Sequence, residues 1–304
     1  MEKRLKCGLA IAGIWGAAWC AQAADDDCVE SQSFTSTVAV AFSGATATVV
    51  NNAGSGVTCL QDGASLAITS TVAGVEYLVS GAATNASLRI GSSRPLKLTL
   101  NGVNLASATN PAIGVWTSNR CYVVLAKGTT NVLADGTVNA AGGAFYGSGP
   151  LIFSGSGFLS VSGTKKHGIS GAGAVRIRDG EFAVPRAVSD AIHAGSFRLD
   201  NGTLALAAYG DGVDAGTVQI AGGALSILSV SNDTKAIKCD GAMTVAGGLV
   251  NATVRGAQGK GIKAADLTLD GGALLFQLSG AAVLTTVTNA ITNGTTVTTN
   301  VYVD

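Results

Sequence analysis

The chain has 304 residues, with 19 basic and 19 acidic side chains and 47% hydrophobic residues. A net charge of zero excludes proteins that coat nucleic acid or another polyanion by bulk charge, so recognition of a charged ligand must be local. Glycine is abundant, at 42 residues, whereas proline occurs only 4 times. No linker or low-complexity spacer is visible, and the length suits one large domain.

Residues 1–23 predict a secretory signal peptide. Three basic residues come first, an apolar run follows from Leu9 to Trp19, and the small-x-small sequence Ala21-Gln22-Ala23 offers a cleavage site. The apolar run is too short to span a bilayer, so we expect no membrane span. The protein is therefore expected to be secreted, at the cell surface or periplasmic. Because the leader carries three basic residues and one acidic residue, the rest has a formal charge near −2.

The remainder, residues 24–304, is expected to form a single domain. Residues 30–74 are rich in Val, Ala, Thr and Ser and predict β-structure. A stack of β-coils needs a cover at each end because its first and last strands expose unpaired edges. We expect 24–74 to supply the N-terminal cap with the first strands, and 281–304 to supply the last rung or a C-terminal cap.

The cysteines can be sorted by position. Cys28 and Cys59 form the expected disulfide in an oxidising compartment. Cys239 falls at an inward position of its repeat, about five coils beyond Cys121. At roughly 4.8 Å per coil the two lie about 24 Å apart, which is too far for a disulfide. Cys239 is therefore predicted to be a buried free thiol.

Recognisable β-rungs begin at Val75. Trp116 is the only tryptophan beyond the leader, and the tyrosines, Tyr146 among them, are scattered. The rings of Trp116 and Tyr146 could face outward near each other, or each could simply cover a rung. Because aromatic residues are sparse, the sequence favours charge-based or shallow recognition over stacking on crystalline cellulose.

A short pattern returns five times between residues 166 and 280. Its copies are HGISG at 167–171, DAIHA at 190–194, DGVDA at 211–215, KAIKC at 235–239 and KGIKA at 260–264. The central aliphatic residues recur every 21 to 25 residues; they are Ile169, Ile192, Val213, Ile237 and Ile262. A glycine corner between two alternating apolar strings accompanies each copy. The pattern predicts an all-β parallel β-helix with about 22 residues and three short strands per coil, the five aliphatic residues stacking in its core.

Equivalent positions in such a coil stack into columns. The first column, two residues before the aliphatic position, contains His167, Asp190, Asp211, Lys235 and Lys260. The second column, one residue after it, contains Ser170, His193, Asp214, Lys238 and Lys263.

The columns bring Asp190, Asp211 and Asp214 together, and oxygen ligands of this kind suit calcium. The lysines beyond them could meet the carboxylates of uronate sugars. The alternatives are surface ion pairs of Asp211 with Lys235 and of Asp214 with Lys238, or a solvated face without any ligand. A separate basic group on another face contains Arg176, Arg178 and Arg198.

Several segments together resemble a known family. They are GVEYLVSG at 74–81, LNGVNLAS at 100–107, NPAIGV at 110–115, GTTNVLADG at 128–136, and the DAIHA and DGVDA copies. Over about residues 35–280 the chain is similar to the secreted carbohydrate-binding β-helix family related to family 9 pectate lyases. The resemblance implies a right-handed parallel β-helix that binds polygalacturonate-type or cellulosic polysaccharides, with calcium bound on the coil. This chain departs from the family pattern in its last two copies, where Lys235 and Lys260 replace acidic residues.

Three functional classes follow. The first is a secreted, monomeric module that binds an acidic plant polysaccharide such as polygalacturonate or pectin, with calcium as the cofactor. Its expected metal ligands are Asp190, Asp211 and Asp214, and its expected sugar contacts are His193, Lys238, Lys263, Lys235 and Lys260. The second is a polysaccharide lyase in which calcium acidifies a proton that Lys235 or Lys260 removes. The third is the structural coil of a surface adhesin. No catalytic residue is assigned, and a binding protein rather than an enzyme is expected.

Overall fold

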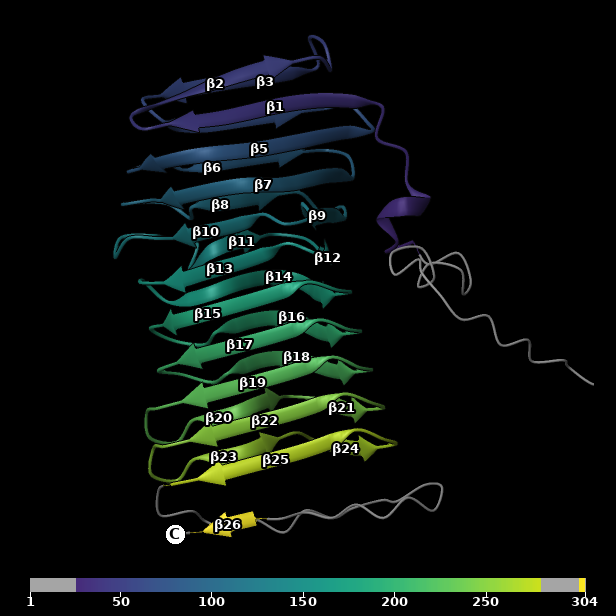
Figure 1. Cartoon of the computed structure of the whole chain (residues 1–304), viewed down its shortest axis with the longest axis vertical. Helices are drawn as coiled ribbons and strands as arrows, with labels where there is room; N and C mark the ends of the chain where they lie inside the picture. Colours follow the sequence, from purple (N-terminus) through teal and green to yellow (C-terminus); the bar gives the residue numbers. More distant parts are fainter. Residues whose placement is uncertain (1–25, 280–300, 304) are drawn as a thin grey trace, which may run out of the picture. The chain divides into compact units, whose positions relative to one another are not determined.

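The computed structural model describes residues 26–279 and the backbone of 301–303. The predicted signal peptide and most of the expected C-terminal cap lie outside the described residues. Two compact units divide the chain at Ser33. In the first unit, a single 3-10 turn, η1 (Val29–Ser31), is described. The second unit, from Phe34 onward, is a parallel β-solenoid of about nine turns of roughly 24 residues (Figure 1). This confirms the predicted fold, with coils slightly longer than expected.

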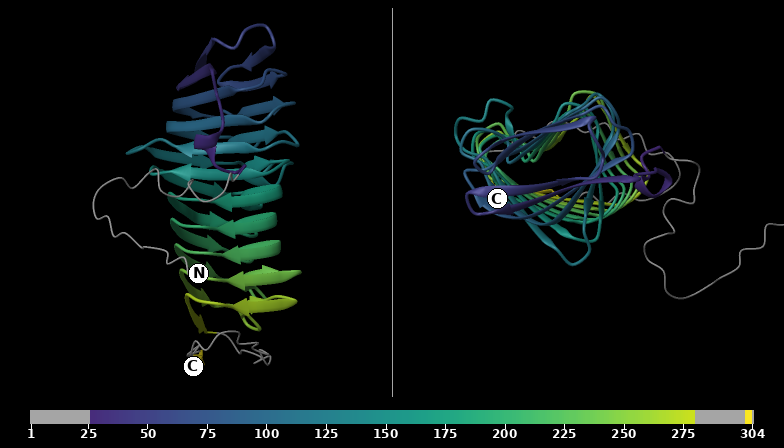
Figure 2. Two further views of the ribbon diagram at one scale, coloured as in Figure 1. Left: turned by 90° about the vertical axis from the view of Figure 1, so that its right-hand side faces the viewer. Right: turned by 90° about the horizontal axis from the view of Figure 1, so that it is seen from above.

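Each coil contributes to three faces, and every face is a ladder of parallel strands. Face 1 contains β4 (Ser65–Ser70), β6 (Leu88–Ser92), β8 (Ile113–Trp116), β11 (Gly143–Gly147), β20 (Lys235–Cys239), β23 (Lys260–Lys263) and the first halves of β14 (His167–Ile177), β16 (Ile192–Leu199) and β18 (Val213–Ile220). Seen from above, the coils superpose around one axis (Figure 2).

The other two faces follow in each coil. Face 2 contains β1 (Ser36–Ser43), β9 (Cys121–Leu125), β12 (Leu151–Gly155), β21 (Ala242–Val245), β24 (Asp266–Leu269), the second halves of β14, β16 and β18, and the first halves of β5 (Val75–Thr84) and β7 (Leu96–Ala106). Face 3 contains the second halves of β5 and β7 and then β10 (Thr130–Ala134), β13 (Phe158–Gly163), β15 (Glu181–Ala187), β17 (Thr203–Ala208), β19 (Ala224–Ser229), β22 (Leu249–Val254), β25 (Ala273–Leu278) and β26 (Val301–Val303).

Two antiparallel strands cover the N-terminal edge. β2 (Thr46–Asn51) pairs with β1, and β3 (Val57–Asp62) pairs with β4. Each covers the outer edge of the first parallel strand on its face, which keeps that edge from pairing with another chain. At the other end, β26 pairs with β25 in parallel.

The predicted aliphatic stack forms the core of face 1. The register pairs Ile169 with Ile192, Ile192 with Val213, Val213 with Ile237 and Ile237 with Ile262. The first four side chains are no more than 1% exposed, and Ile262 in the last of these coils is partly buried. The stack is therefore confirmed, and it holds the residues on either side of each aliphatic position in a fixed outward register.

The glycine corners are required by the backbone. Gly202 has a φ of +98°, and a Cβ there would lie 2.6 Å from the carbonyl oxygen of Gly180 in the preceding coil. Close stacking of the coils and a positive φ together exclude any larger residue.

One disulfide prediction is wrong. Cys59 is a free, exposed thiol on β3 and forms no bridge to Cys28. β3 is the outermost strand at the N-terminal edge and is exposed after Val57, which the sequence pattern of this region did not reveal. The prediction for Cys239 is confirmed, because its side chain is free and only 2% exposed.

Candidate ligand-binding face

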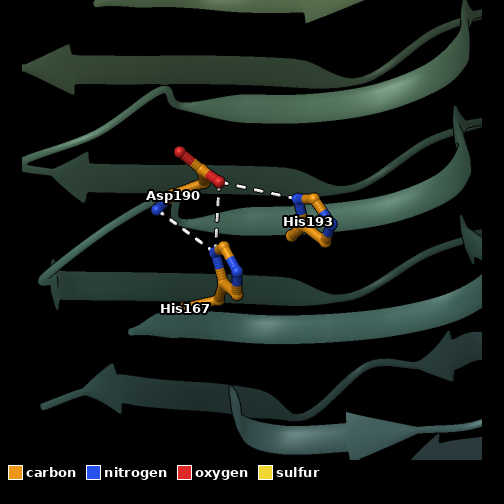
Figure 3. A group of neighbouring side chains, drawn as sticks. All are labelled: His167, Asp190 and His193. Atoms are coloured by element: carbon orange, nitrogen blue, oxygen red, sulfur yellow. Dashed lines mark hydrogen bonds and ion pairs between the residues drawn. The ribbon is translucent and has the colours of Figure 1, made fainter. Parts of the chain in front are cut away.

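The two predicted columns lie side by side on face 1. The residues of the first column stand where the chain enters β14, β16, β18, β20 and β23, and those of the second column point outward from the same strands. Figure 3 shows how His167, Asp190 and His193 converge from two successive coils. Described residues of both columns thus form one continuous series of polar and charged side chains, partly buried at its N-terminal end, which we call the charged ladder.

In the first column, side chains of one coil accept hydrogen bonds from backbone N–H groups of the next coil. The Asp190 N–H donates to Nδ1 of His167 at 3.3 Å, the Asp211 N–H to Oδ1 of Asp190 at 2.9 Å, and the Lys235 N–H to Oδ1 of Asp211 at 2.6 Å. Lysine cannot accept a hydrogen bond, so at the next coil the Lys260 N–H donates to the Thr234 carbonyl instead. Sequence reasoning missed this capping role, although an aspartate just before a strand is a recognisable signal for it.

Asp190 is a nearly buried carboxylate between two imidazoles. Its Oδ2 lies 3.1 Å from Nδ1 of His167 and 3.6 Å from Nδ1 of His193, and the two rings stack with centroids 4.5 Å apart (Figure 3). Burial alone would raise the pKa of Asp190. The two neighbouring imidazoles and the hydrogen bond from the Asp211 N–H outweigh burial and hold that pKa well below its usual range. The Asp190 carboxylate in turn raises the pKa of His193.

Nδ1 of His167 faces both a donor and an acceptor. This nitrogen accepts the Asp190 N–H in the tautomer that leaves it without a proton and donates to Oδ2 of Asp190 in the tautomer that places a proton on it, so it cannot do both at once. Nε2 of this ring is buried and has no hydrogen-bond partner within the described part of the chain. His167 is therefore a packed structural residue with one unsatisfied nitrogen.

Asp211 and Asp214 differ in how their charges are balanced. Both carboxylate oxygens of Asp214 lie 3.1 Å from Nζ of Lys238, and His193 Nδ1 lies 3.5 Å away. Asp214 accordingly raises the pKa of Lys238. Burial and repulsion from Asp190 and Asp214 raise the pKa of Asp211. The hydrogen bond that its carboxylate accepts from the Lys235 N–H lowers this pKa, but by less. Asp211 is thus the least neutralised carboxylate of the ladder.

The ion-pair hypothesis is therefore half correct. Asp214 pairs with Lys238 as the column alignment predicts. Asp211 does not pair with the Lys235 ammonium, which instead contacts Asp233, an exposed residue of the preceding turn that also lies 3.3 Å from Lys260 Nζ. The turn bends the lysine side chain away from the column, a detail that register alone does not fix.

Two groups of side chains on the ladder could each hold a cation. Asp190, Asp211 and Asp214 each offer an oxygen, and these atoms lie within 4.8 Å of one another; Asp190 also forms such a group with His167 and His193. The all-oxygen group suits calcium, which accepts irregular carboxylate geometry. The predicted ligands are thus brought together, with Lys238 and His193 as competing cations.

The other basic group is less available. Asp200, which is 6% exposed, lies between the guanidinium groups of Arg176 and Arg198, and Arg198 also donates to Gln219 at 2.6 Å. These arginines are committed to protein partners. By contrast, Lys263 is exposed and has no carboxylate within ion-pair distance among the described residues.

The fold and the ladder define a class of protein: a parallel β-solenoid with a regularly spaced, partly exposed polar face. Among described residues, no helix is long and apolar enough to cross a membrane. A family model described as "Carbohydrate-binding domain-containing protein" matches residues 62–302, and the chain belongs to this family. Its carbohydrate-binding character follows from that membership, whereas a relation to family 9 pectate lyases stays a prediction.

Comparison with other proteins gives the fold further support. No curated protein matches the chain. A solved structure, described as a polysaccharide lyase-like protein from C. thermocellum in a gadolinium derivative, superposes with a TM-score of 0.67 at 21% identity. The match covers 79% of this chain and 96% of that one. At this identity the likeness shows the shared solenoid alone.

Proposed function

We propose that this protein is a secreted, non-catalytic module that binds an acidic, uronate-containing polysaccharide along the charged ladder. One observation carries the proposal. Four lysines stand at register-paired positions on β20 and β23. Asp233 forms ion pairs with Lys235 and Lys260, Asp214 pairs with Lys238, and Lys263 has no carboxylate partner in the described part of the chain. This excess of positive charge at the strand spacing complements a row of sugar carboxylates.

The proposal includes a calcium ion at the acidic end of the ladder. Asp190, Asp211 and Asp214 provide clustered oxygens, and Asp211 lacks a cationic partner among described residues. A calcium ion there would offset the repulsion between these carboxylates and leave coordination positions for sugar oxygens. Lys238 and His193 compete with calcium for this group, because Lys238 already pairs with Asp214 and His193 lies beside Asp190.

Binding to polygalacturonate tests the lysines. Lys263→Gln should weaken binding several-fold at low salt, and the loss should shrink as salt rises. Lys127→Gln is the matched control, because it removes the same charge from an exposed corner of another part of the coil. Equal affinities of the two variants would place the sugar elsewhere.

Calcium is tested by stability. If the ion binds, mass action raises the free energy of unfolding by about 2.7 kcal/mol when the calcium concentration is 100 times Kd, and the melting temperature rises with it. Asp211→Asn should abolish the shift while keeping an oxygen for the Lys235 N–H. If the ladder consists of ion pairs only, calcium has no effect on either protein.

A further inference from the structure

A concave feature lies on face 1, toward the N-terminal end of the solenoid and away from the charged ladder. It is a cleft of about 400 Å³ between the β3–β4 hairpin and strands β6 and β8. Its walls include Leu60, which is 76% exposed, and Arg89 and Trp116, with Asp62 and Asn110 also lining it. We call it the Trp116 cleft.

The indole of Trp116 lies over Gly114, whose lack of a side chain makes room for the ring. Gly114 occupies an outward position on β8, and a Cβ there would lie 2.3 Å from Cζ3 of the indole, so only glycine leaves room for the ring. Register places Arg89 beside Gly114 in the preceding coil and Tyr146 beside it in the following coil. The Arg89 guanidinium lies 3.9 Å from the indole centroid, and the Tyr146 ring lies 5.2 Å away.

Arg89 is a positioned cation without an anion. It is exposed, and within the described part of the chain no carboxylate lies within ion-pair distance of it. Stacking on the indole orients its planar fork without using its N–H donors, which leaves them free for a planar carboxylate. Asp62 and Asn110 add an acceptor and an amide for sugar hydroxyls.

The cleft and the charged ladder belong to one column. Successive register pairs connect Arg89, Gly114, Tyr146, Ser170, His193, Asp214, Lys238 and Lys263 without interruption. Arg89 and Lys263 are seven coils apart, which at roughly 4.8 Å per coil is about 34 Å. One extended glycan can therefore contact both ends, and the second contact is then intramolecular.

We infer that the Trp116 cleft is a separate sugar-binding subsite for a uronate residue, with the Arg89 fork on its carboxylate and its ring against the indole edge and Leu60. The inference rests on the proposed function for its ligand class, but its residues are distinct from those of the charged ladder. A cleft of mixed apolar and polar lining with few converging polar groups is typical of small-ligand sites.

The test uses oligogalacturonate and its methyl ester. Trp116 fluorescence should change on adding the oligomer, and the Trp116→Phe protein identifies the part of the signal that comes from this residue. Arg89→Gln should weaken binding of the free acid about tenfold, as expected for a lost charged hydrogen bond, and leave binding of the ester unchanged. Trp116→Ala should weaken both ligands, and Trp116→Phe should restore part of the affinity, which separates a lost contact from a misfolded cleft.

The outcomes separate this inference from the proposed function. Unchanged fluorescence together with wild-type affinity in Arg89→Gln overturns the subsite, even if Lys263→Gln weakens binding and so supports the ladder. An Arg89→Gln loss that is equal for acid and ester overturns the carboxylate contact. Loss in the Arg89 and Trp116 variants with none in Lys263→Gln supports the cleft and overturns the ladder.

Discussion

Two substitutions of Asp211 separate its structural role from its charge. In the wild type the Lys235 N–H donates to Oδ1 of Asp211 at 2.6 Å, and Asp211→Ala removes this acceptor. An unsatisfied, partly buried donor costs about 1–2 kcal/mol, which for a domain of this size lowers the melting temperature by roughly 2–6 °C. Asp211→Asn keeps an oxygen in the same place, so the contact between coils survives.

The sign of the charge effect follows from the raised pKa of Asp211. A carboxyl group whose folded-state pKa exceeds its unfolded value contributes stability below the unfolded value, near 3.9, and that contribution is lost as pH rises through the folded pKa. Above that pH the wild type carries an uncompensated charge beside Asp190 and Asp214. In metal-free buffer at pH 7, Asp211→Asn should therefore melt no lower than the wild type, and any advantage should vanish near pH 3.5.

Thermal unfolding followed by circular dichroism, with chelator present, compares the three proteins. Hydrogen exchange at the Lys235 amide adds a local measurement, because a solenoid can open in parts. Protection there should fall about tenfold in the alanine variant and stay unchanged in the asparagine variant. Equal losses in both variants would refute the capping role and leave the negative charge itself as the stabilising feature.

Three further predictions concern the core, the thiols and catalysis. Val213→Asp places an unpaired charge at a fully buried position, so it should unfold the middle coils, as measured by limited proteolysis; a wild-type digestion pattern would contradict the core register. Maleimide should label Cys59 in the native protein but Cys121 and Cys239 only after denaturation, because burial shields both and raises their pKa; native labelling of Cys239 would place it outside the core. Polygalacturonate with calcium should give no rise in absorbance from unsaturated uronate, since the charged groups spread along a ladder; a rise that disappears in Lys235→Ala would favour a lyase instead.

The sequence alone determined the coil. A motif that returns every 21 to 25 residues, with a glycine corner in each copy, can bury its aliphatic residues only by stacking, and this fixed the register from Ile169 to Ile262. Register in turn placed Asp190, Asp211 and Asp214 together and paired Asp214 with Lys238. Such inferences succeed because the strand period and coil spacing are properties of the backbone, shared by every copy.

The tertiary structure decided how the individual side chains are used. Lys235 turns to Asp233 and Asp211 turns to a backbone N–H, because both carboxylates lie within reach and the local turn selects between them. The Trp116 cleft exists because the β3–β4 hairpin, outside the repeats, adds a wall beside Arg89. Periodicity carries no information on partners contributed by non-repeating segments, so the cleft follows only from the folded chain.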